Sequence, residues 1–265
     1  MARRPLRALQ VEVTSRCTRC CTVCARTAYA GSWLEGDLDE GLWRRLAPDL
    51  HLVDHLHLQG WGEPLLHPRL AAMVAEGQAA GCRVGLTTNG DLLPAAQEWI
   101  LAAPPDLLAV SVAGADAANR RLRDGALASE VLAAVAELAA RRSSRRRPRL
   151  HLSYLLTRDG ADDLEAVVLS AAAAGVDAVL VNHLDVVPTA ALAPLAAWGP
   201  DGVPPGVGEA LAAAAAAARR ARIELRLPAL APEERLVCDL DPRRILSVRW
   251  DGRVAPCVHL NLPVG

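Results

Sequence analysis

The segment Cys17-Thr18-Arg19-Cys20-Cys21-Thr22-Val23-Cys24 contains four cysteines in eight positions and follows the apolar run Leu9–Val13. A tight loop has no room to bury four cysteines separately as core residues. Thiolates this close together hold a metal ion, exchange disulfides or bind an iron–sulfur cluster. Taken as Cys17, Cys21 and Cys24, the spacing is Cys-x-x-x-Cys-x-x-Cys, and Cys20 is then an additional residue.

The composition of the whole chain narrows the class of protein. Its 265 residues suffice for one large α/β domain with a small appendage. A formal charge of −1 does not favour nucleic acid or a membrane surface as a partner. The first residues, Met1–Pro5, run into a strand-like segment and not into the apolar core of a signal peptide, and no uncharged apolar segment reaches about 18 residues. We therefore predict a cytoplasmic protein, in which seven cysteines favour metal or redox chemistry over disulfides.

Every basic residue apart from histidine is an arginine, because the chain has no lysine. A pyridoxal-phosphate Schiff base and a phosphate-binding P-loop both require lysine, so both are excluded. The arginine-rich run Arg141–Arg149 contains no aromatic residue for base stacking. We interpret this run as a solvated connector and expect no nucleic-acid partner.

Short apolar runs alternate with longer helical patterns, which predicts βα units and a parallel sheet. Strands are expected near Leu9–Thr14, Leu52–Gln59, Arg83–Thr88, Leu107–Val112, Leu150–Leu156 and Asp177–Asn182. Helices are expected near Glu40–Ala47, Pro68–Gly81, Ala95–Ala102, Ser129–Arg141, Asp162–Gly175 and Gly208–Ala221. The spacing alone permits an open barrel of six units, a doubly wound sheet or a full barrel of eight units.

Polar and glycine-rich segments follow several of these strands. Gly60-Trp61-Gly62-Glu63-Pro64 follows the second strand, Thr87-Thr88-Asn89-Gly90 the third, and Ser111-Val112-Ala113-Gly114 the fourth. The active residues of such barrels lie at the carboxyl ends of the strands. Together with the cysteine spacing, this set of motifs resembles the radical S-adenosylmethionine (radical SAM) superfamily, over about residues 8–257.

The resemblance implies a fold, two cofactors and a class of reaction. The fold is a partial (β/α)6 TIM-like barrel with a short C-terminal extension that contains cysteines. Cys17, Cys21 and Cys24 would hold a [4Fe-4S] cluster whose open iron binds S-adenosylmethionine (SAM). An electron from a flavodoxin or ferredoxin would then cleave SAM to a 5′-deoxyadenosyl radical. That radical would abstract hydrogen from a peptide, a protein or a small molecule, as in a maturase or a biosynthetic enzyme.

The same resemblance assigns the SAM-binding residues. Gly60, Gly62, Glu63 and Pro64 match the family's Gly-Gly-Glu-Pro motif, whose backbone oxygens and carboxylate hold the methionine amino group. A cationic amine needs acceptors of this kind, and Glu63 supplies a negative charge.

Four further positions complete the predicted SAM site. Asn89 matches the segment beside the nucleoside, and Ser111 is assigned to the ribose or to the methionine carboxylate. Arg123 would meet that carboxylate, with Arg120 and Arg121 as competitors for the role. Val23 stands near the adenine where relatives often have an aromatic residue. Ala113 departs from the family pattern and removes a polar contact.

The last residues change in character. Cys238 and Cys257 stand in the pattern Cys-x(13)-Gly-x(4)-Cys, and Asp251-Gly252 predicts the turn of a hairpin. This pattern resembles the start of SPASM or twitch extensions, in which such cysteines hold an auxiliary [4Fe-4S] cluster. We expect a core at residues 1–228 and an incomplete extension at residues 229–265, because the later cysteines of a SPASM domain are absent. The alternative is that both are structural cysteines.

Strand alternation predicts a polar interior. His55, His57 and Gln59 share one face of the second strand, and His151, Ser153 and Thr157 share one face of the fifth. These side chains would line a cavity for a polar substrate, or they would be hydrogen-bonded core and rim residues.

Two alternatives for the function remain open at this point. The segment Trp250-Asp251-Gly252 with Pro256-Cys257 resembles relatives associated with tungsten-cofactor enzymes, which favours a role in cofactor biosynthesis. A protein of another class would use Cys17–Cys24 for zinc or thiol redox chemistry without SAM. The residues assign no catalytic acid or base.

Overall fold

The computed structural model describes residues 4–143, 147–184, 190–197, 202–230 and 241–262. Its strands form one sheet in the order β7-β6-β5-β4-β3-β2-β1-β8-β9. The strands are β1 Leu6–Val11, β2 Val53–Leu58, β3 Arg83–Thr88, β4 Leu107–Val112, β5 Arg149–Leu156, β6 Ala178–His183, β7 Glu224–Arg226, β8 Ile245–Val248 and β9 Val254–Ala255. Neighbouring strands run parallel, except that β8 and β9 are antiparallel.

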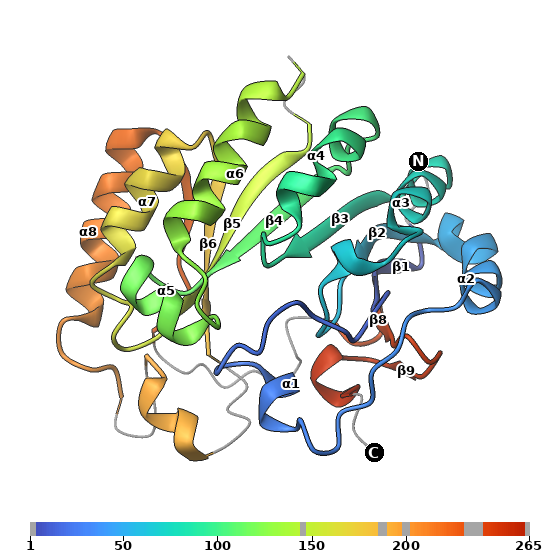
Figure 1. Cartoon of the computed structure of the whole chain (residues 1–265), viewed down its shortest axis with the longest axis horizontal. Helices are drawn as coiled ribbons and strands as arrows, with labels where there is room; N and C mark the ends of the chain where they lie inside the picture. Colours follow the sequence, from blue (N-terminus) through green and yellow to red (C-terminus); the bar gives the residue numbers. More distant parts are fainter. Residues whose placement is uncertain (1–3, 144–146, 185–189, 198–201, 231–240, 263–265) are drawn as a thin grey trace.

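Helices connect the strands and cover one side of the sheet (Figure 1). The α-helices are α1 Ala25–Ala28, α2 Glu40–Leu46, α3 Leu70–Ala79, α4 Leu93–Ala102, α5 Asp116–Leu122, α6 Ala128–Arg141, α7 Leu164–Ala173 and α8 Val207–Ala221. Short 3-10 helices are η1 Ala47–Leu52, η2 Pro64–Leu66, η3 Ala190–Leu195 and η4 Val258–Leu260. No helix among these described residues is long and apolar enough to cross a membrane.

The two faces of each strand have different neighbours. In β4, Leu108, Val110 and Val112 are buried in the core under the helices. The alternate residues Ala109 and Ser111 line interior cavities. A doubly wound sheet would have helices on both faces, whereas here one face is hollow. The predicted open barrel of βα units is therefore confirmed.

The predicted strands and helices are present, with a shift in the first strand. The expected strand near Leu9–Thr14 lies at Leu6–Val11, because these residues pair with both β2 and β8. Thr14 instead forms an isolated bridge with Asp37. Thr157, which was predicted to face the interior with His151, is buried at the end of β5 and accepts the Gly160 N–H at 3.2 Å.

The predicted C-terminal hairpin is present as β8 and β9, and its turn residue Gly252 has a φ of +85°. Its position was not predicted. β8 pairs in parallel with β1 and so extends the sheet on the side of the strand that leads into the cysteine loop. Pairing of distant strands cannot be read from periodicity, since both neighbours of β1 satisfy the same hydrogen-bond pattern.

Asn119 of α5 stabilises the loop after β4. Its side chain is completely buried, accepts the Ala113 N–H at 2.8 Å and donates to the Ala126 carbonyl at 2.9 Å. We predict that Asn119→Ala lowers the free energy of unfolding by roughly 1–3 kcal/mol, because it leaves two buried backbone groups without partners. Urea unfolding followed by circular dichroism measures this change. Ser170→Ala, at an exposed site, is the control, and equal stability of both variants would contradict the assignment.

Candidate active site

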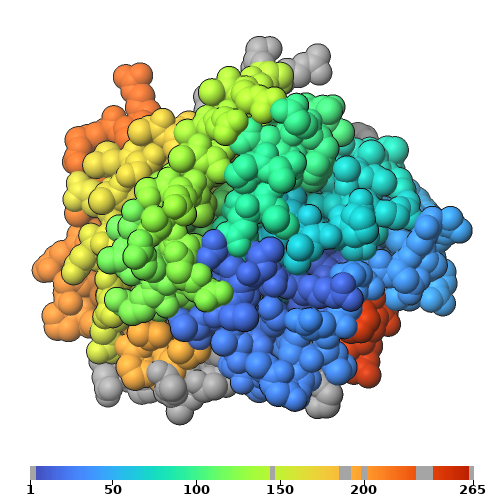
Figure 2. All heavy atoms as spheres, in the orientation of Figure 1, coloured from blue at the N-terminus to red at the C-terminus, as the bar shows by residue number. Residues whose placement is uncertain are grey.

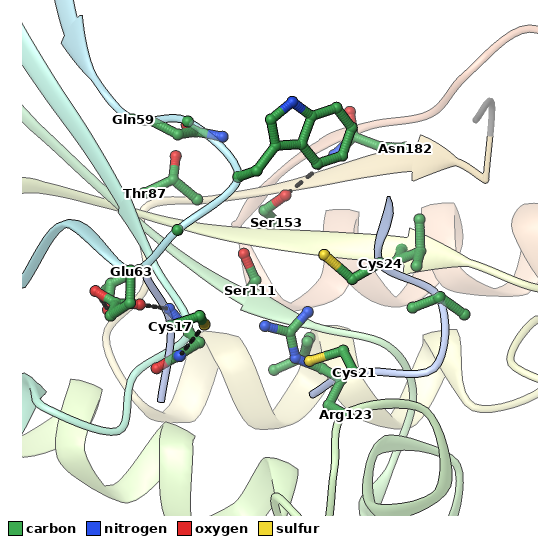
Figure 3. Close-up of a pocket in the computed structure, with 18 residues that line it drawn as sticks. Cys17, Cys21, Cys24, Gln59, Glu63, Thr87, Ser111, Arg123, Ser153 and Asn182 are labelled. Carbon is green, nitrogen blue, oxygen red and sulfur yellow. Dashed lines mark hydrogen bonds between the residues drawn. The ribbon is translucent and has the colours of Figure 1, made fainter. Parts of the chain in front are cut away.

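The carboxyl ends of β1, β2 and β3 are adjacent in the sheet, so the loops that follow them meet. Together with β4, β5 and β6 they enclose a cavity of about 320 Å³ (Figure 3). Its lining consists of Cys17, Cys21, Val23, Cys24, Gln59, Gly60, Trp61, Gly62, Glu63, Thr87, Thr88, Asn89, Ser111, Val112, Arg123, Ser153, Leu155 and Asn182.

The cysteine loop is fixed to two other parts of the barrel. Arg19 pairs with Asp91 after β3, and its guanidinium also donates to the Asp124 carbonyl at 2.9 Å. The backbone N–H of Cys20 donates to the Asp124 carboxylate at 2.9 Å. Figure 2 shows the N-terminal residues, in blue, packed against the green α5 region. These contacts orient Cys17, Cys21 and Cys24 toward the cavity and leave Cys20 exposed outside it.

The thiols of this loop are partly shielded from water. Burial raises the pKa of Cys21 to about 11, and the nearby Arg123 guanidinium opposes that rise. Burial also raises the pKa of Cys24. Both thiols are therefore protonated at neutral pH without a metal, and a bound metal must displace these protons.

The three cavity-facing sulfurs surround a space and do not converge on a point. Within the described ranges, no group of three His, Cys, Asp or Glu side chains is arranged to hold a metal ion. In Figure 3, Cys17 lies on one side of the cavity and Cys21 and Cys24 on the other, with Ser111 and Arg123 between them. A donor set of three thiolates around a cavity suits a cluster of several atoms.

The loop after β2 lies directly on the cysteine loop. A Cβ on Gly62 would stand 2.3 Å from the Thr14 carbonyl oxygen and 2.5 Å from that of Arg16. A Cβ on Gly60 would stand 2.2 Å from Cγ of Glu12. Only glycine permits this approach of the two backbones. The Glu63 N–H then donates to the Arg16 carbonyl at 2.8 Å.

Glu63 joins the loops after β2 and β3. Its side chain accepts the Leu65 N–H at 3.0 Å, the Thr88 hydroxyl at 2.8 Å and the Asn89 N–H at 2.7 Å. Burial raises the pKa of the carboxyl group, and these three hydrogen bonds counteract the rise. Much of its acceptor capacity is therefore used within the protein, and the remaining capacity lies at the cavity wall.

The structure brings most of the predicted site residues to this cavity. Asn89 lies 3.6 Å from the Cys17 sulfur through its amide nitrogen and donates to Thr18 at 2.9 Å. Among the three arginines considered, Arg123 lines the cavity, whereas Arg121 pairs with Asp159 at the surface. Val23 and Ser111 also belong to the lining.

Other predicted residues are not in the lining. Pro64 is buried at the start of η2 and supports the loop from outside the cavity. Ala113 is buried, and its N–H donates to Asn119. Cys257 precedes η4 and is half-buried. Cys238 lies outside the described residues.

Sequence reasoning missed several residues of the site. Trp61 lines the cavity and packs edge-on against Trp33 and His259, with ring centroids 6.5 and 6.1 Å apart. Asn182 reaches the cavity from the end of β6. Its position at the end of a predicted strand was the available signal. Glu12, at the end of β1, had no signal, because its contacts with Trp61 and the C-terminal hairpin are tertiary.

The profile of the Radical SAM superfamily matches residues 11–171, which include the three cysteines and the loops after β2, β3 and β4. The chain is therefore a radical SAM enzyme and belongs to this superfamily. This agrees with the fold and with the cysteine-lined cavity. The alternative of a zinc or thiol-redox protein that works without SAM is set aside.

Individual proteins and solved structures are also similar to this chain. The chain is 28% identical over 256 residues to the tungsten-containing aldehyde ferredoxin oxidoreductase cofactor-modifying protein of Pyrococcus furiosus, covering 94% of this chain and 70% of that protein. Streptococcus suis SuiB bound to S-adenosylmethionine superposes with a TM-score of 0.71 at 12% identity, over 96% of this chain and 60% of SuiB. SuiB is also known bound to its precursor peptide SuiA. Native anSMEcpe with bound AdoMet superposes with a TM-score of 0.63 at 14% identity, over 95% of this chain and 74% of that chain.

The cofactors of this superfamily, a [4Fe-4S] cluster and SAM, fit the residues present. The cavity supplies three thiols, a glycine-lined backbone surface, the buried carboxylate of Glu63 and the cation of Arg123. A carboxylate and a guanidinium on one cavity suit the amino and carboxylate groups of an amino-acid moiety.

We predict that Cys20→Ser retains iron, whereas Cys21→Ser loses it. Cys20 is exposed and outside the cavity lining, while Cys21 is buried and within it. Iron content after anaerobic reconstitution measures the difference. Because the two cysteines are adjacent, each variant controls for the other. The opposite pattern would show that the ligand assignment is wrong.

The raised pKa of the buried Glu12 side chain leads us to predict that stability depends on pH. Its Oε1 accepts the Trp61 N–H at 2.9 Å, its Oε2 has no hydrogen-bond partner in the described part of the chain, and burial raises its pKa from 4.5 to about 7. A raised carboxyl pKa means that the folded state retains a proton which the unfolded state loses. The protonated Glu12 side chain therefore makes its full contribution to the free energy of unfolding below pH 4.5. This contribution is lost as the pH rises to about 7.

Glu12→Gln should remove this loss. Relative to the variant, the unmodified protein should lose up to roughly 3 kcal/mol of stability between pH 4.5 and 7. Urea unfolding of both proteins across this range tests the expectation. Parallel pH profiles would mean that the pKa of Glu12 is not raised in the folded state.

Proposed function

We propose that Cys17, Cys21 and Cys24 hold the cluster and that the loops after β2, β3 and β4 hold SAM. Glu63 and the backbone oxygens beside it would accept hydrogen bonds from the methionine amino group, and Arg123 would pair with its carboxylate. Asn89 and Ser111 would position the nucleoside, and Val23 would contact the adenine. What carries this proposal is that all of these residues line one cavity, although they come from the loops after β1, β2 and β3, from β4 and from the end of α5.

When bound, the reduced cluster and SAM supply a primary carbon radical that removes a hydrogen atom from the substrate. The protein's part is to position the reactants and to exclude water. Trp61, with Trp33 and His259 packed against its ring, closes one wall of the cavity. Arg19 and Asp91 hold the cysteine loop in place during this reaction.

We propose that the substrate is a small molecule modified during cofactor biosynthesis for a tungsten enzyme. The relative from Pyrococcus furiosus, which is named as a cofactor-modifying protein of a tungsten-containing oxidoreductase, matches nearly the whole chain and supports this. A barrel interior with a cavity of about 740 Å³ is of the size that small-molecule ligands occupy.

A second candidate is the modification of a peptide or protein, as in a maturase. SuiB, which shares the fold over nearly the whole of this chain, is known with its precursor peptide bound. The chain spans 60% of the length of SuiB, so the shared fold is only part of that protein.

We further propose the SPASM or twitch subgroup, with a core at residues 1–228 and an extension at residues 229–265. The spacing of Cys238 and Cys257 supports an auxiliary cluster in that extension. β8 and β9 belong to the extension and yet continue the core sheet beside β1.

The electron donor in this proposal is a flavodoxin or a ferredoxin, which supplies one electron at a time. Free thiols and a cluster that must be reduced favour the cytoplasm as the compartment. Neither nucleic acid nor a membrane is proposed as a partner.

Anaerobic reconstitution with SAM and dithionite tests the function. We expect about four irons per chain from the SAM cluster and the release of 5′-deoxyadenosine even without substrate. Cys21→Ser, treated identically, should lose these four irons and release no 5′-deoxyadenosine. Stoichiometric zinc without iron would overturn the proposal, as would an iron-loaded protein that leaves SAM intact.

A further inference from the structure

The barrel interior continues away from the cysteine cavity. The cavity of about 740 Å³ shares Gln59, Thr87, Ser153 and Asn182 with the cysteine cavity, and Figure 3 shows these four side chains together at its wall. A further pocket of about 380 Å³ shares His57 and His151 with the larger cavity. The interior is therefore hollow from the cysteine loop to the end where the strands begin. We call the part around His151 the lower lumen.

His151 is the unusual residue of the lower lumen. Its side chain is 8% exposed, and neither Nδ1 nor Nε2 has a hydrogen-bond partner in the described part of the chain. Its register partners on β4 and β6 are Ala109 and Ala178, whose small side chains leave space beside the imidazole. A buried polar group without a partner is destabilising, so this arrangement points to a ligand.

His57 lines the same interior but, unlike His151, has hydrogen-bond partners within the protein. Its Nε2 lies 2.6 Å from Oε1 of Gln59 and 3.2 Å from Oγ1 of Thr87. Gly85 makes room for the ring, because a Cβ there would stand 2.6 Å from Nδ1 of His57. His57 is thus held by the protein, whereas the described residues leave the imidazole of His151 facing the cavity without a hydrogen-bond partner.

The charges around the lower lumen favour an anion. Arg83, Arg149 and Arg226 line the pocket, and the described lining residues include one carboxylate, that of Asp106. Arg149 and Arg226 share Glu224 as an ion-pair partner, at 2.7 Å for Arg226. Arg83 has no ion pair within the described ranges. Guanidinium groups and imidazole N–H donors are the groups that bind phosphate in proteins.

The protonation of His151 agrees with this. Burial lowers its pKa, and the charges of Arg149 and Arg226 lower it further, while Glu224 and Asp177 oppose them. The imidazole is therefore neutral in the empty pocket and can donate one hydrogen bond. A bound anion would favour the imidazolium form of His151, whose second N–H can donate another hydrogen bond.

We propose that the lower lumen binds a tetrahedral oxyanion through His151, with Arg149 and Arg226 as its charge partners. The inference rests on the proposed function and narrows its substrate to a small molecule that carries a phosphate group. His151 is four residues from Leu155 along β5, about 13 Å in a strand, and Leu155 lines the cysteine cavity. A substrate of that length would reach the SAM site while its phosphate is held at His151. Free tungstate is also a tetrahedral oxyanion with two negative charges, and it is the second source of the ligand that the test considers.

Titration of the reconstituted protein with inorganic phosphate and with sodium tungstate, at fixed salt, tests this proposal. In protein with ¹³C-labelled histidine, either anion should raise the pKa of His151, whose signal His151→Phe identifies. Calorimetry should show at least tenfold weaker binding for His151→Phe and for Arg149→Ala. Arg149 is half exposed, so its replacement provides a variant that does not disturb the core. His51→Phe and Arg45→Ala, both exposed, are the matched controls.

The two anions distinguish the source of the ligand. Similar affinities support a phosphate group of the substrate, and a tenfold or greater preference for tungstate supports free tungstate at the same site. A His151 signal that neither anion shifts at millimolar concentration would overturn the proposal. Iron content and 5′-deoxyadenosine release by the unmodified protein test the proposed function separately, so a failure of either is distinguishable.

Discussion

The hydrogen bonds of one buried carboxylate hold the site together. Glu63 is 2% exposed, and it receives hydrogen bonds from its own loop and from Thr88 and Asn89 after β3. Removal of a charge from water is costly unless donors compensate for it, so these loops are constrained to lie where their donors reach the carboxylate. Through Asn89 the constraint reaches Thr18 and the Cys17 sulfur. The cysteine loop is therefore positioned by the same carboxylate.

Close backbone contact also positions the cysteine loop. Gly62 lies against the carbonyls of Thr14 and Arg16, at a separation that no side chain permits. The far side of the cysteine loop is held by charge, through Arg19 with Asp91 and through the Cys20 N–H on Asp124. A short loop with little core of its own is thus ordered by its neighbours. This matters for a cluster site, because three sulfurs must keep their arrangement around one cavity.

The barrel interior divides into two chemical environments. Near the cysteines, the polar groups are bound to one another, as in Glu63 and Asn89, or face the cavity beside sulfur. In the lower lumen, no described residue is a hydrogen-bond partner of His151, and three arginines line the adjoining pocket. The two regions share a wall, so one elongated substrate can contact both. The distance between them, set by the rise of β5, limits which substrates can do so.

The sequence alone determined the alternation of strands and helices, the cysteine spacing and the position of each polar motif after a strand. These are local properties: periodicity, turn residues and ligand spacing are written in consecutive positions. Cys17, Cys21, Cys24, Glu63 and Asn89 were found by matching such local motifs to those of a known family, and all five line the cavity. The motif match favoured Arg123 over Arg121, but the sequence could not show that Arg123 lines the cavity while Arg121 does not. Nor could it show that Pro64 supports the loop from outside.

Only the tertiary structure decided those points, along with the pairing of β8 with β1 and the burial of Glu12 and His151. Each depends on which distant residues become neighbours. The free energy of a buried polar group is set by partners that lie tens of residues away, and no local pattern records them.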